Sequence, residues 1–134
     1  MLNKKINPLD FESDIAIGIG LPFNSDLSGF KLNYTTEEQI HSNFRNLILT
    51  RRGERVMHPT FGSLLYDLLF EPANDSEFDT KAKEAVIKAT SEWMPFVSIQ
   101  YVDITYHDNT AHVSINYKVK DLDINNILDV TVKV

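Results

Sequence analysis

The spacing of apolar residues changes at Pro95 of this 134-residue chain, and this change most constrains its fold. Upstream of Pro95, apolar residues recur every three or four positions, which is the spacing of an amphipathic α-helix. Downstream they alternate with polar residues, which is the spacing of a strand with one buried face. Helices followed by strands predict an α+β fold, with about three helices packed on one face of a small, mainly antiparallel sheet.

Three strands are predicted after Pro95. In the first strand, one face is expected to carry Val97, Ile99 and Tyr101, and the other Val102 and Ile104. A turn at residues 107–109 leads into a second strand, residues 111–119, whose apolar residues alternate strictly. The closing strand places four apolar residues on one side, namely Leu128, Val130, Val132 and Val134. The other side of the meander is expected to be solvated, because it carries Ser114, Asn116 and Lys118.

The first predicted helix begins near Thr35, which has the capping-box spacing with Glu38. Arg51 and Arg52 are expected in its last turn, where cations oppose the carbonyl end of the helix dipole. Gly53 is expected to be the left-handed residue that ends it. Its predicted apolar stripe is Ile40, Phe44, Leu47 and Ile48.

Two further helices and an N-terminal arm complete the prediction. A short helix is expected over residues 64–70, with Ser63 as its N-cap. A third begins after residues 74–76 and ends before Pro95. Its predicted buried face is Phe78, Ala82, Ala85, Val86, Ala89 and Trp93. Residues 1–33 are predicted to form an extended N-terminal arm and loop, and residues 34–134 a single α+β domain.

Composition excludes several classes of function. Cysteine is absent, which removes thiolate catalysis, disulfides and cysteine-containing zinc sites. The chain has 13 Lys and Arg against 19 Asp and Glu, a net charge of −6, so we expect no nucleic-acid partner. No segment has the length and apolarity of a signal peptide or membrane span, so we expect a soluble protein without a membrane partner.

Metal and nucleophile patterns are weak. The histidines lack metal-ligand spacing, although His107 and His112 could face each other across the predicted hairpin. Ser63 lacks the second glycine of a nucleophile elbow, so a helix cap is the favoured interpretation. We therefore expect no metal, no other cofactor and no small-molecule substrate.

Glycoside hydrolysis requires two carboxyl groups, one kept protonated by an apolar setting. Glu71, between Phe70 and Pro72, is the best candidate acid. Its candidate partner carboxylates are Asp67, Glu54 and Asp103. No spacing fixes the second group, so catalysis is the alternative and a structural role is favoured.

The closing strand offers a different kind of site. A strand at a sheet edge leaves backbone N–H and C=O groups unpaired, which invites strand addition by another chain. Its apolar side carries Leu128, Val130, Val132 and Val134, and Lys133 is the only charge near its end. The pattern leaves open whether this strand is a free edge or lies inside the sheet.

The stretch LTRRGERVMHPTFGSLLYDLLFEP, residues 49–72, is here termed the motif segment. It resembles the gene-25-type baseplate wedge family of contractile-tailed, T-even-like phages, which is also labelled lysozyme-like. The family pattern is a helix ending in L-x-T-[RK]-x-G-E-R, then a proline, F-G-[ST], an apolar helix and F-E-P. It is met by Leu49, Thr50, Arg51, Gly53, Glu54, Arg55, Pro59, Phe61, Gly62, Ser63, Phe70, Glu71 and Pro72. IGIGLPF, residues 17–23, is also similar to the family's lead-in.

From its own residues, the motif segment is predicted to join two helix ends. Gly53 would finish the first helix, and Ser63 would start the next. Glu54, Arg55 and Glu71 are expected to link the two ends ionically. The segment is therefore interpreted as a structural connection rather than an active site.

The resemblance implies a structural, non-enzymatic late protein of the virion tail baseplate, assembled in the host cytoplasm. Implied partners are other baseplate wedge subunits and the tail sheath protein, with tail tube or hub proteins as further candidates. The first sheath ring would add strands to its sheet. The alternative is an acidic lysozyme (muramidase) associated with the tail. A third hypothesis is an adaptor in the baseplate of a contractile injection system.

One departure from the family pattern lies before the first strand. The family usually carries Glu-Pro-Arg there, whereas this chain has Trp93-Met94-Pro95-Phe96-Val97 and keeps only the proline. No role of the family glutamate and arginine is therefore transferred. Trp93, Met94 and Phe96 are expected to form core or partner contacts instead.

Overall fold

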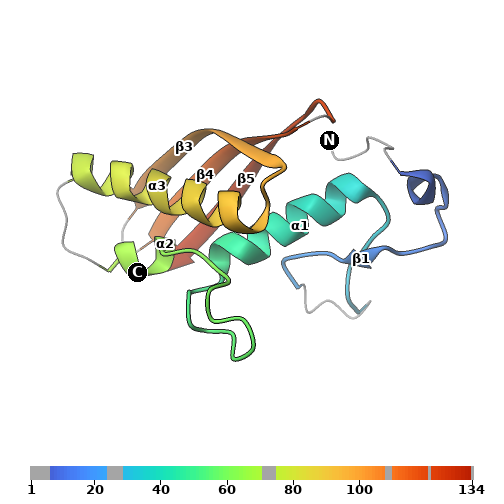
Figure 1. Cartoon of the computed structure of the whole chain (residues 1–134), viewed down its shortest axis with the longest axis horizontal. Coiled ribbons are helices and arrows are strands. Elements are labelled where there is room, and N and C mark those ends of the chain that lie inside the picture. Colours follow the sequence, from blue (N-terminus) through green and yellow to red (C-terminus); the bar gives the residue numbers. More distant parts are fainter. Residues whose placement is uncertain (1–6, 24–28, 71–74, 108–109, 121, 134) are drawn as a thin grey trace. The chain divides into compact units, whose positions relative to one another are not determined.

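The computed structural model describes residues 7–23, 29–70, 75–107, 110–120 and 122–133. These residues form three α-helices and two small antiparallel sheets, as expected for the predicted α+β class (Figure 1). The chain divides into two compact units, Met1–Asn46 and Leu47–Val134. The predicted boundary after residue 33, the extended arm and the packing of all helices on one sheet face stay predictions.

In the first unit, buried polar groups connect short elements to the start of α1 (Thr36–Leu49). The elements are a 3₁₀ helix, η1 (Pro8–Phe11), and a two-stranded sheet of β1 (Gly18–Ile19) and β2 (Leu32–Asn33). The buried Asp10 carboxylate accepts hydrogen bonds from the Thr36 N–H (2.8 Å) and hydroxyl (2.9 Å). The β2 strand lies in a segment predicted to be a loop, because its short ladder has no periodic signal of its own.

Helix α1 begins as predicted but ends earlier. The capping box is confirmed: Thr35 Oγ1 accepts from the Glu38 N–H (3.3 Å), and the Glu38 carboxylate accepts from the Thr35 N–H (3.4 Å). The expectation that Arg51 and Arg52 lie in the last turn is wrong, since the helix ends at Leu49. Both arginines instead pair with carboxylates of later helices. Three residues of the predicted stripe are buried, namely Phe44, Leu47 and Ile48.

The second unit contains α2 (Leu65–Leu68) and α3 (Asp75–Trp93), which pack against each other. Helix α2 is shorter than predicted, and its N-cap position is Leu64 rather than the predicted Ser63. The Ser63 hydroxyl still accepts a hydrogen bond from the Leu65 N–H (3.4 Å) at the start of the helix. Helix α3 ends before Pro95 as predicted, but it begins at Asp75, slightly earlier than predicted. Its predicted buried face is confirmed at Phe78, Ala82, Ala85, Val86 and Ala89, whereas Trp93 is half-buried.

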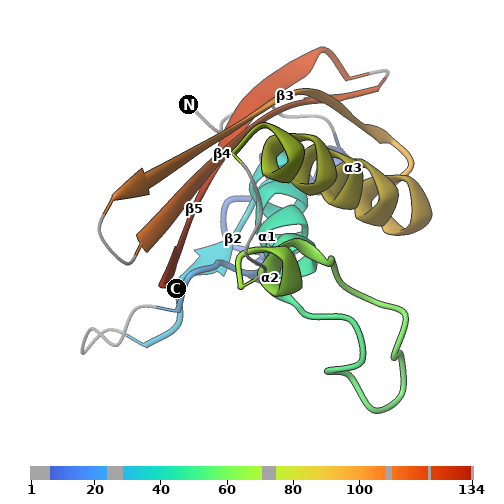
Figure 2. The same ribbon diagram turned by 90° about the vertical axis from the view of Figure 1, so that its left-hand side faces the viewer.

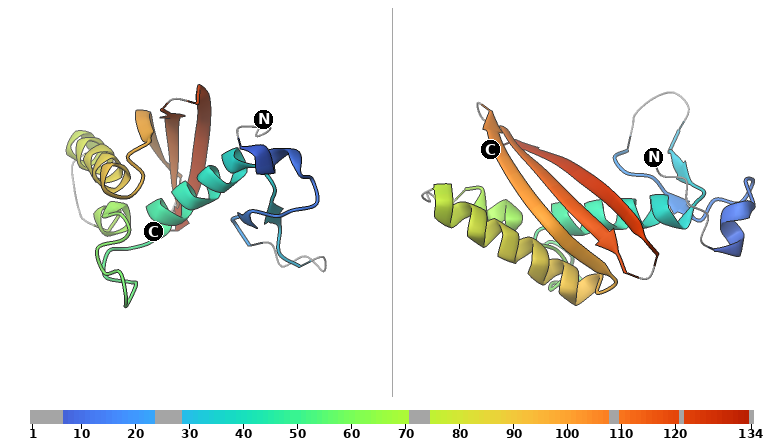
Figure 3. Two further views of the ribbon diagram at one scale, coloured as in Figure 1. Left: turned by 45° about the vertical axis from the view of Figure 1, so that its right-hand side comes forward. Right: turned by 90° about the horizontal axis from the view of Figure 1, so that it is seen from above.

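The larger sheet is a three-stranded antiparallel meander in the order β3-β4-β5, confirming the predicted strands. The strands are β3 (Val97–His107), β4 (Thr110–Val119) and β5 (Ile124–Lys133). Figures 2 and 3 show α3 lying along the sheet on the β3 side, and α3 contacts β3. Alternate residues of β4 and β5 build the buried face: Ala111, Val113, Ile115, Tyr117, Val119, Ile124, Leu128, Val130 and Val132.

A bulge at Gln100 makes the predicted facing of β3 wrong. Ile99 pairs with Tyr117, but Tyr101 pairs with Asn116, so one extra residue is present on β3. The extra residue reverses the alternation, as β-bulges do. Val102 therefore returns to the face of Ile99, and Tyr101 turns outward with 60% of its surface exposed.

Candidate functional site

The loop between α1 and α2, residues 50–64, is termed the connecting loop, and it projects from the second unit in Figures 1 and 2. Its two ends meet in a parallel bridge between Arg51 and Ser63. The Ser63 N–H donates to the Thr50 carbonyl (2.9 Å), and the Ser63 hydroxyl donates to the Ile48 carbonyl (2.7 Å). Ser63 is 1% exposed, so its hydroxyl is engaged in the fold and inaccessible to a substrate.

Gly62 permits this close approach of the two loop ends. Its φ is +120°, a conformation that residues with a Cβ rarely adopt. A Cβ at this position would lie 2.4 Å from the Thr50 carbonyl oxygen and 3.0 Å from the Arg51 carbonyl carbon. The glycine of the F-G-S triplet is therefore required by both backbone angle and space.

The distal part of the loop is closed by its own backbone. The Gly53 N–H donates to the Pro59 carbonyl (2.7 Å), and Gly53 has φ +86°. The Arg51 N–H donates to the Glu54 carboxylate (2.9 Å). Gly53 thus serves the loop, and its predicted place at the end of α1 is wrong, because α1 stops before it.

Two ion pairs connect the loop to helices. Arg51 pairs with Asp67 of α2, and Arg52 pairs with Glu92 of α3. Asp67 raises the pKa of Arg51 above its ordinary value, first through the side-chain hydrogen bond and then through Coulombic attraction. The raised pKa keeps Arg51 in its charged form, which is also the ordinary form of arginine at neutral pH.

The predicted ionic link among Glu54, Arg55 and Glu71 stays a prediction, and the structure describes only the contacts of Glu54 and Arg55. Glu54 contacts the Arg51 backbone, and the Arg55 guanidinium lies 4.1 Å from the centre of the Phe61 ring. Glu71 and Pro72 lie outside the residues that the structure describes.

Trp93 supports the loop from the end of α3. Its ring lies edge-on to Phe61 (5.0 Å between centroids) and His58 (6.3 Å), and its Nε1 donates to the Thr60 carbonyl (3.3 Å). Met94 is buried. The apolar replacement for the family Glu-Pro-Arg thus supplies one core residue and one support for the connecting loop.

The tip of the loop consists of two almost fully exposed apolar residues, Val56 (94%) and Met57 (85%). Sequence reasoning missed them. The feature that could have revealed them is an apolar dipeptide within a short segment of mainly charged residues, between Gly53 and Pro59. It also missed Glu92, which pairs with Arg52 across 40 positions of sequence.

The catalytic alternative gains little from the geometry. The Asp67 carboxylate is engaged by Arg51, whereas a general acid needs an apolar setting that keeps it protonated. Its candidate partner Glu71 lies outside the described residues, and Glu54 and Asp103 are exposed.

His107 and His112, which could have faced each other across the hairpin, do not do so. His112 faces Thr105, and His107 faces Thr110. Among the described residues, no three His, Asp or Glu side chains gather in a way that could hold a metal ion. No helix among them is long and apolar enough to cross a membrane.

The sheet has two edges, and β5 forms one of them. Within the described part of the chain, β5 pairs only with β4 along the whole of Ile124–Lys133. The predicted edge residues Leu128, Val130 and Val132 point into the core, at 0 to 2% exposure, and Val134 lies outside the described residues. What β5 offers outward is therefore its backbone, not these side chains.

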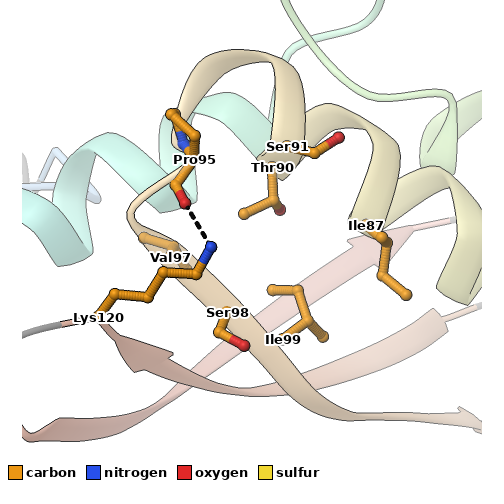
Figure 4. Close-up of a pocket in the computed structure, with 8 residues that line it drawn as sticks. All are labelled: Ile87, Thr90, Ser91, Pro95, Val97, Ser98, Ile99 and Lys120. Atoms are coloured by element: carbon orange, nitrogen blue, oxygen red, sulfur yellow. Dashed lines mark hydrogen bonds between the residues drawn. The ribbon is translucent and has the colours of Figure 1, made fainter.

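The edge at β3 differs, because the bulge at Gln100 interrupts its ladder. A groove of about 290 Å³ lies between the end of α3 and the start of β3 (Figure 4). Lys120 Nζ crosses it to donate to the Pro95 carbonyl (3.0 Å). The groove is lined by Ile87, Thr90, Ser91, Pro95, Val97, Ser98, Ile99 and Lys120. None of these lining residues is an Asp, Glu or His that could act as an acid or base together with Lys120.

The model of the family described as baseplate wedge protein gp25 matches residues 35–123. No curated protein matches the chain. Among solved structures, the chain is similar to a candidate tail lysozyme of Geobacter sulfurreducens, with a TM-score of 0.66 and 25% identity over 75% of this chain and 92% of that one.

Two baseplate structures share the fold. One is the anti-feeding prophage baseplate, with a TM-score of 0.51 and 18% identity over 82% of this chain and 77% of the other. The other is the post-contraction baseplate of pyocin R2, with a TM-score of 0.50 and 15% identity over 84% and 97%.

Proposed function

Because the chain belongs to the baseplate wedge protein gp25 family, we propose that it is a structural wedge subunit that starts sheath assembly in a contractile tail-like particle. The site of this function is the outer edge of β5, to which a sheath subunit adds a strand. Other baseplate components are its first partners. The tail sheath protein is the partner at β5, and tube or hub proteins are further candidates.

The observation that carries the proposal is the length and regularity of the β5 edge. Its ten residues pair with β4 in unbroken register, and alternate side chains are anchored in the core. A regular, anchored edge presents its backbone groups in the geometry that strand addition requires. The β3 edge is less suitable, since a bulge twists an edge away from pairing.

The charge along β5 also suits an added strand. Its outward-facing side chains include Asp129, Thr131 and Lys133, so both signs of charge are present near the edge. Ser114 Oγ of β4 donates to the Asp129 carboxylate (2.7 Å), which stays charged, so Asp129 and Lys133 are the two charged side chains of β5. Two separate charges of opposite sign are weak protection against pairing.

The test is a pair of proline substitutions at neighbouring positions, Thr131→Pro and Val132→Pro. Consecutive residues of a strand direct their N–H groups to opposite sides. One proline therefore removes a bond to β4 and weakens the fold, whereas the other removes a donor from the outer edge. Thr131→Ala and Val132→Ala control for the lost side chains.

We expect the outer-edge proline variant to fold, to enter baseplates and to leave them without a sheath. The fold is checked by circular dichroism, baseplate entry by sedimentation, and sheath by electron microscopy. Strand addition at β5 would be refuted if baseplates assembled with Thr131→Pro and baseplates assembled with Val132→Pro both carried sheaths of normal length.

A tail-associated muramidase is the second candidate, because one similar structure is that of a candidate tail lysozyme. Its test is peptidoglycan clearing by the wild-type chain and by Glu71→Gln and Asp67→Asn, at acid and neutral pH. Absence of clearing by the folded wild-type protein would remove this function. Clearing that either substitution abolishes would establish it.

The particle can be a phage, with assembly in the host cytoplasm, or a contractile injection system. Both kinds of contractile particle require a wedge at which the sheath begins, so the β5 proposal is the same for both. The genes that neighbour this one distinguish them.

A further inference from the structure

The tip of the connecting loop is an exposed apolar surface, separate from the β5 edge. Val56 and Met57 are 94% and 85% exposed, more than any other large apolar residue among those that the structure describes. Scattered exposed apolar residues are common on monomers. Two adjacent exposed apolar residues at the end of a projecting loop are unusual. The contacts that hold the loop beneath them are the main argument for a binding role.

That construction holds the tip in one place. The Gly53–Pro59 backbone hydrogen bond closes the loop directly below the tip, and the Phe61 N–H donates to the His58 carbonyl (3.1 Å). On the side of the loop, the Arg55 guanidinium stacks on Phe61, which in turn packs edge-on against Trp93. An apolar tip on a preordered loop loses little conformational entropy when it binds.

The charges beside the tip identify the chemistry of the partner. Residues 51–58 carry three arginines and one glutamate, in a chain whose net charge is −6. Arg51 and Arg52 are matched by Asp67 and Glu92. Arg55, next to the tip, has no ion pair within the described residues and stacks on a ring instead. A partner carboxylate near Arg55 would complete the pattern set by its two neighbours.

We propose that Val56 and Met57 insert into an apolar pocket of another baseplate protein, and that a carboxylate at the rim of that pocket pairs with Arg55. This inference rests on the proposed baseplate function, but it concerns a different surface from β5. Methionine suits such a pocket because its unbranched side chain adapts to irregular shapes. A phosphate-rich partner is disfavoured, since the two tip residues cannot bind phosphate and Arg51 and Arg52 already pair with carboxylates, which leaves one arginine for such a partner.

The experiment uses baseplates purified from cells that produce the full chain with a photo-crosslinking amino acid at position 57. A second variant carries the same group at Lys83, an exposed position on α3. We expect position 57 to crosslink one baseplate protein in high yield and position 83 to give at most a tenth of that yield. Mass spectrometry of the crosslinked peptide then identifies the pocket.

The carboxylate is tested by charge reversal. Arg55→Glu should reduce incorporation of the chain at least tenfold, and exchange of the identified partner carboxylate for arginine should restore it. Val56→Ser with Met57→Ser should give the same loss with an unchanged melting temperature, because both side chains are exposed. A double variant that enters baseplates normally, or a crosslink yield at 57 no higher than at 83, would overturn the inference.

The outcomes separate this inference from the proposed function. If the wild-type chain is absent from baseplates, the proposed function fails. If it is present and position 57 stays uncrosslinked, only the tip inference fails. Flotation with phosphatidylglycerol vesicles provides a further test: binding that depends on Val56 and Met57 would assign the tip to a membrane and refute a protein pocket.

Discussion

Alanine at Gly62 should destabilise the chain far more than alanine at Gly53. Both glycines have positive φ, +120° and +86°, so a side chain at either position meets backbone strain. That strain alone costs about 1 kcal/mol. The surroundings differ: a Cβ at Gly53 meets nothing within 4 Å, whereas at Gly62 it would lie 2.4 Å from the Thr50 carbonyl oxygen.

The additional cost at Gly62 follows from the bridge it supports. Relief of a 2.4 Å contact requires the two loop ends to separate, which strains or breaks the bond from the Ser63 N–H to the Thr50 carbonyl. Loss of a buried hydrogen bond with its donor left unsatisfied costs about 1–3 kcal/mol. The expected totals are about 1 kcal/mol for Gly53→Ala and about 2–4 kcal/mol for Gly62→Ala.

The assay is thermal unfolding followed by the fluorescence of Trp93, the only tryptophan in the chain. For a chain of this length, 1 kcal/mol corresponds to roughly 4 °C in melting temperature. Gly62→Ala should therefore melt about 10 °C below wild type, and Gly53→Ala about 4 °C below it. Equal losses for the two variants would refute the argument that close approach of the loop ends, and not backbone angle alone, requires Gly62.

Three other predictions concern the second unit. Ser63→Ala removes the hydroxyl bond to a helix carbonyl at a site 1% exposed and should cost about 1–3 kcal/mol, measured by urea unfolding. Asp67→Asn should lower the melting temperature less than Ser63→Ala does, with a difference from wild type that shrinks in 1 M salt, because its pair with Arg51 is solvent-exposed. The pKa of Arg51 is raised, so Arg51 loses its proton, and the pair its stabilising effect, only at pH above the ordinary pKa of arginine. The difference in melting temperature between Asp67→Asn and wild type should therefore not change through titration of Arg51 between about pH 6 and 9. Deletion of Gln100 should leave the fold intact, because it removes the bulge and keeps the alternation of β3, whereas deletion of Asn116 should prevent folding by reversing half of β4; circular dichroism distinguishes the two.

The larger sheet could be predicted from the sequence because its signal is local. In β4, every second residue from Ala111 to Val119 is apolar, and each of these is buried. In β3 the same rule gave the wrong faces after Ile99. A bulge depends on pairing with the neighbouring strand, and the polar Gln100 looks like an ordinary outward-facing residue when β3 is considered alone.

The ion pairs of the connecting loop show a second limit. Arg51 and Arg52 follow an apolar helical stripe, and that position favoured a role at the helix end. Their partners Asp67 and Glu92 are 16 and 40 positions away, and no spacing rule relates them. Local signals such as the Thr35 capping box were recoverable, whereas contacts set by tertiary packing were not.

The connecting loop also explains why a motif of this density need not mark an active site. Its polar groups are used internally: Ser63 bonds two backbone segments, Glu54 bonds the Arg51 backbone, and Arg51 pairs with a helix. Catalysis would need some of these groups accessible to a substrate, but Ser63 is 1% exposed. The groups left outside this network are the apolar tip and Arg55, which suit contact with a protein surface. Most residues of the motif therefore maintain the loop, and the proposed recognition falls to its apolar tip and to Arg55.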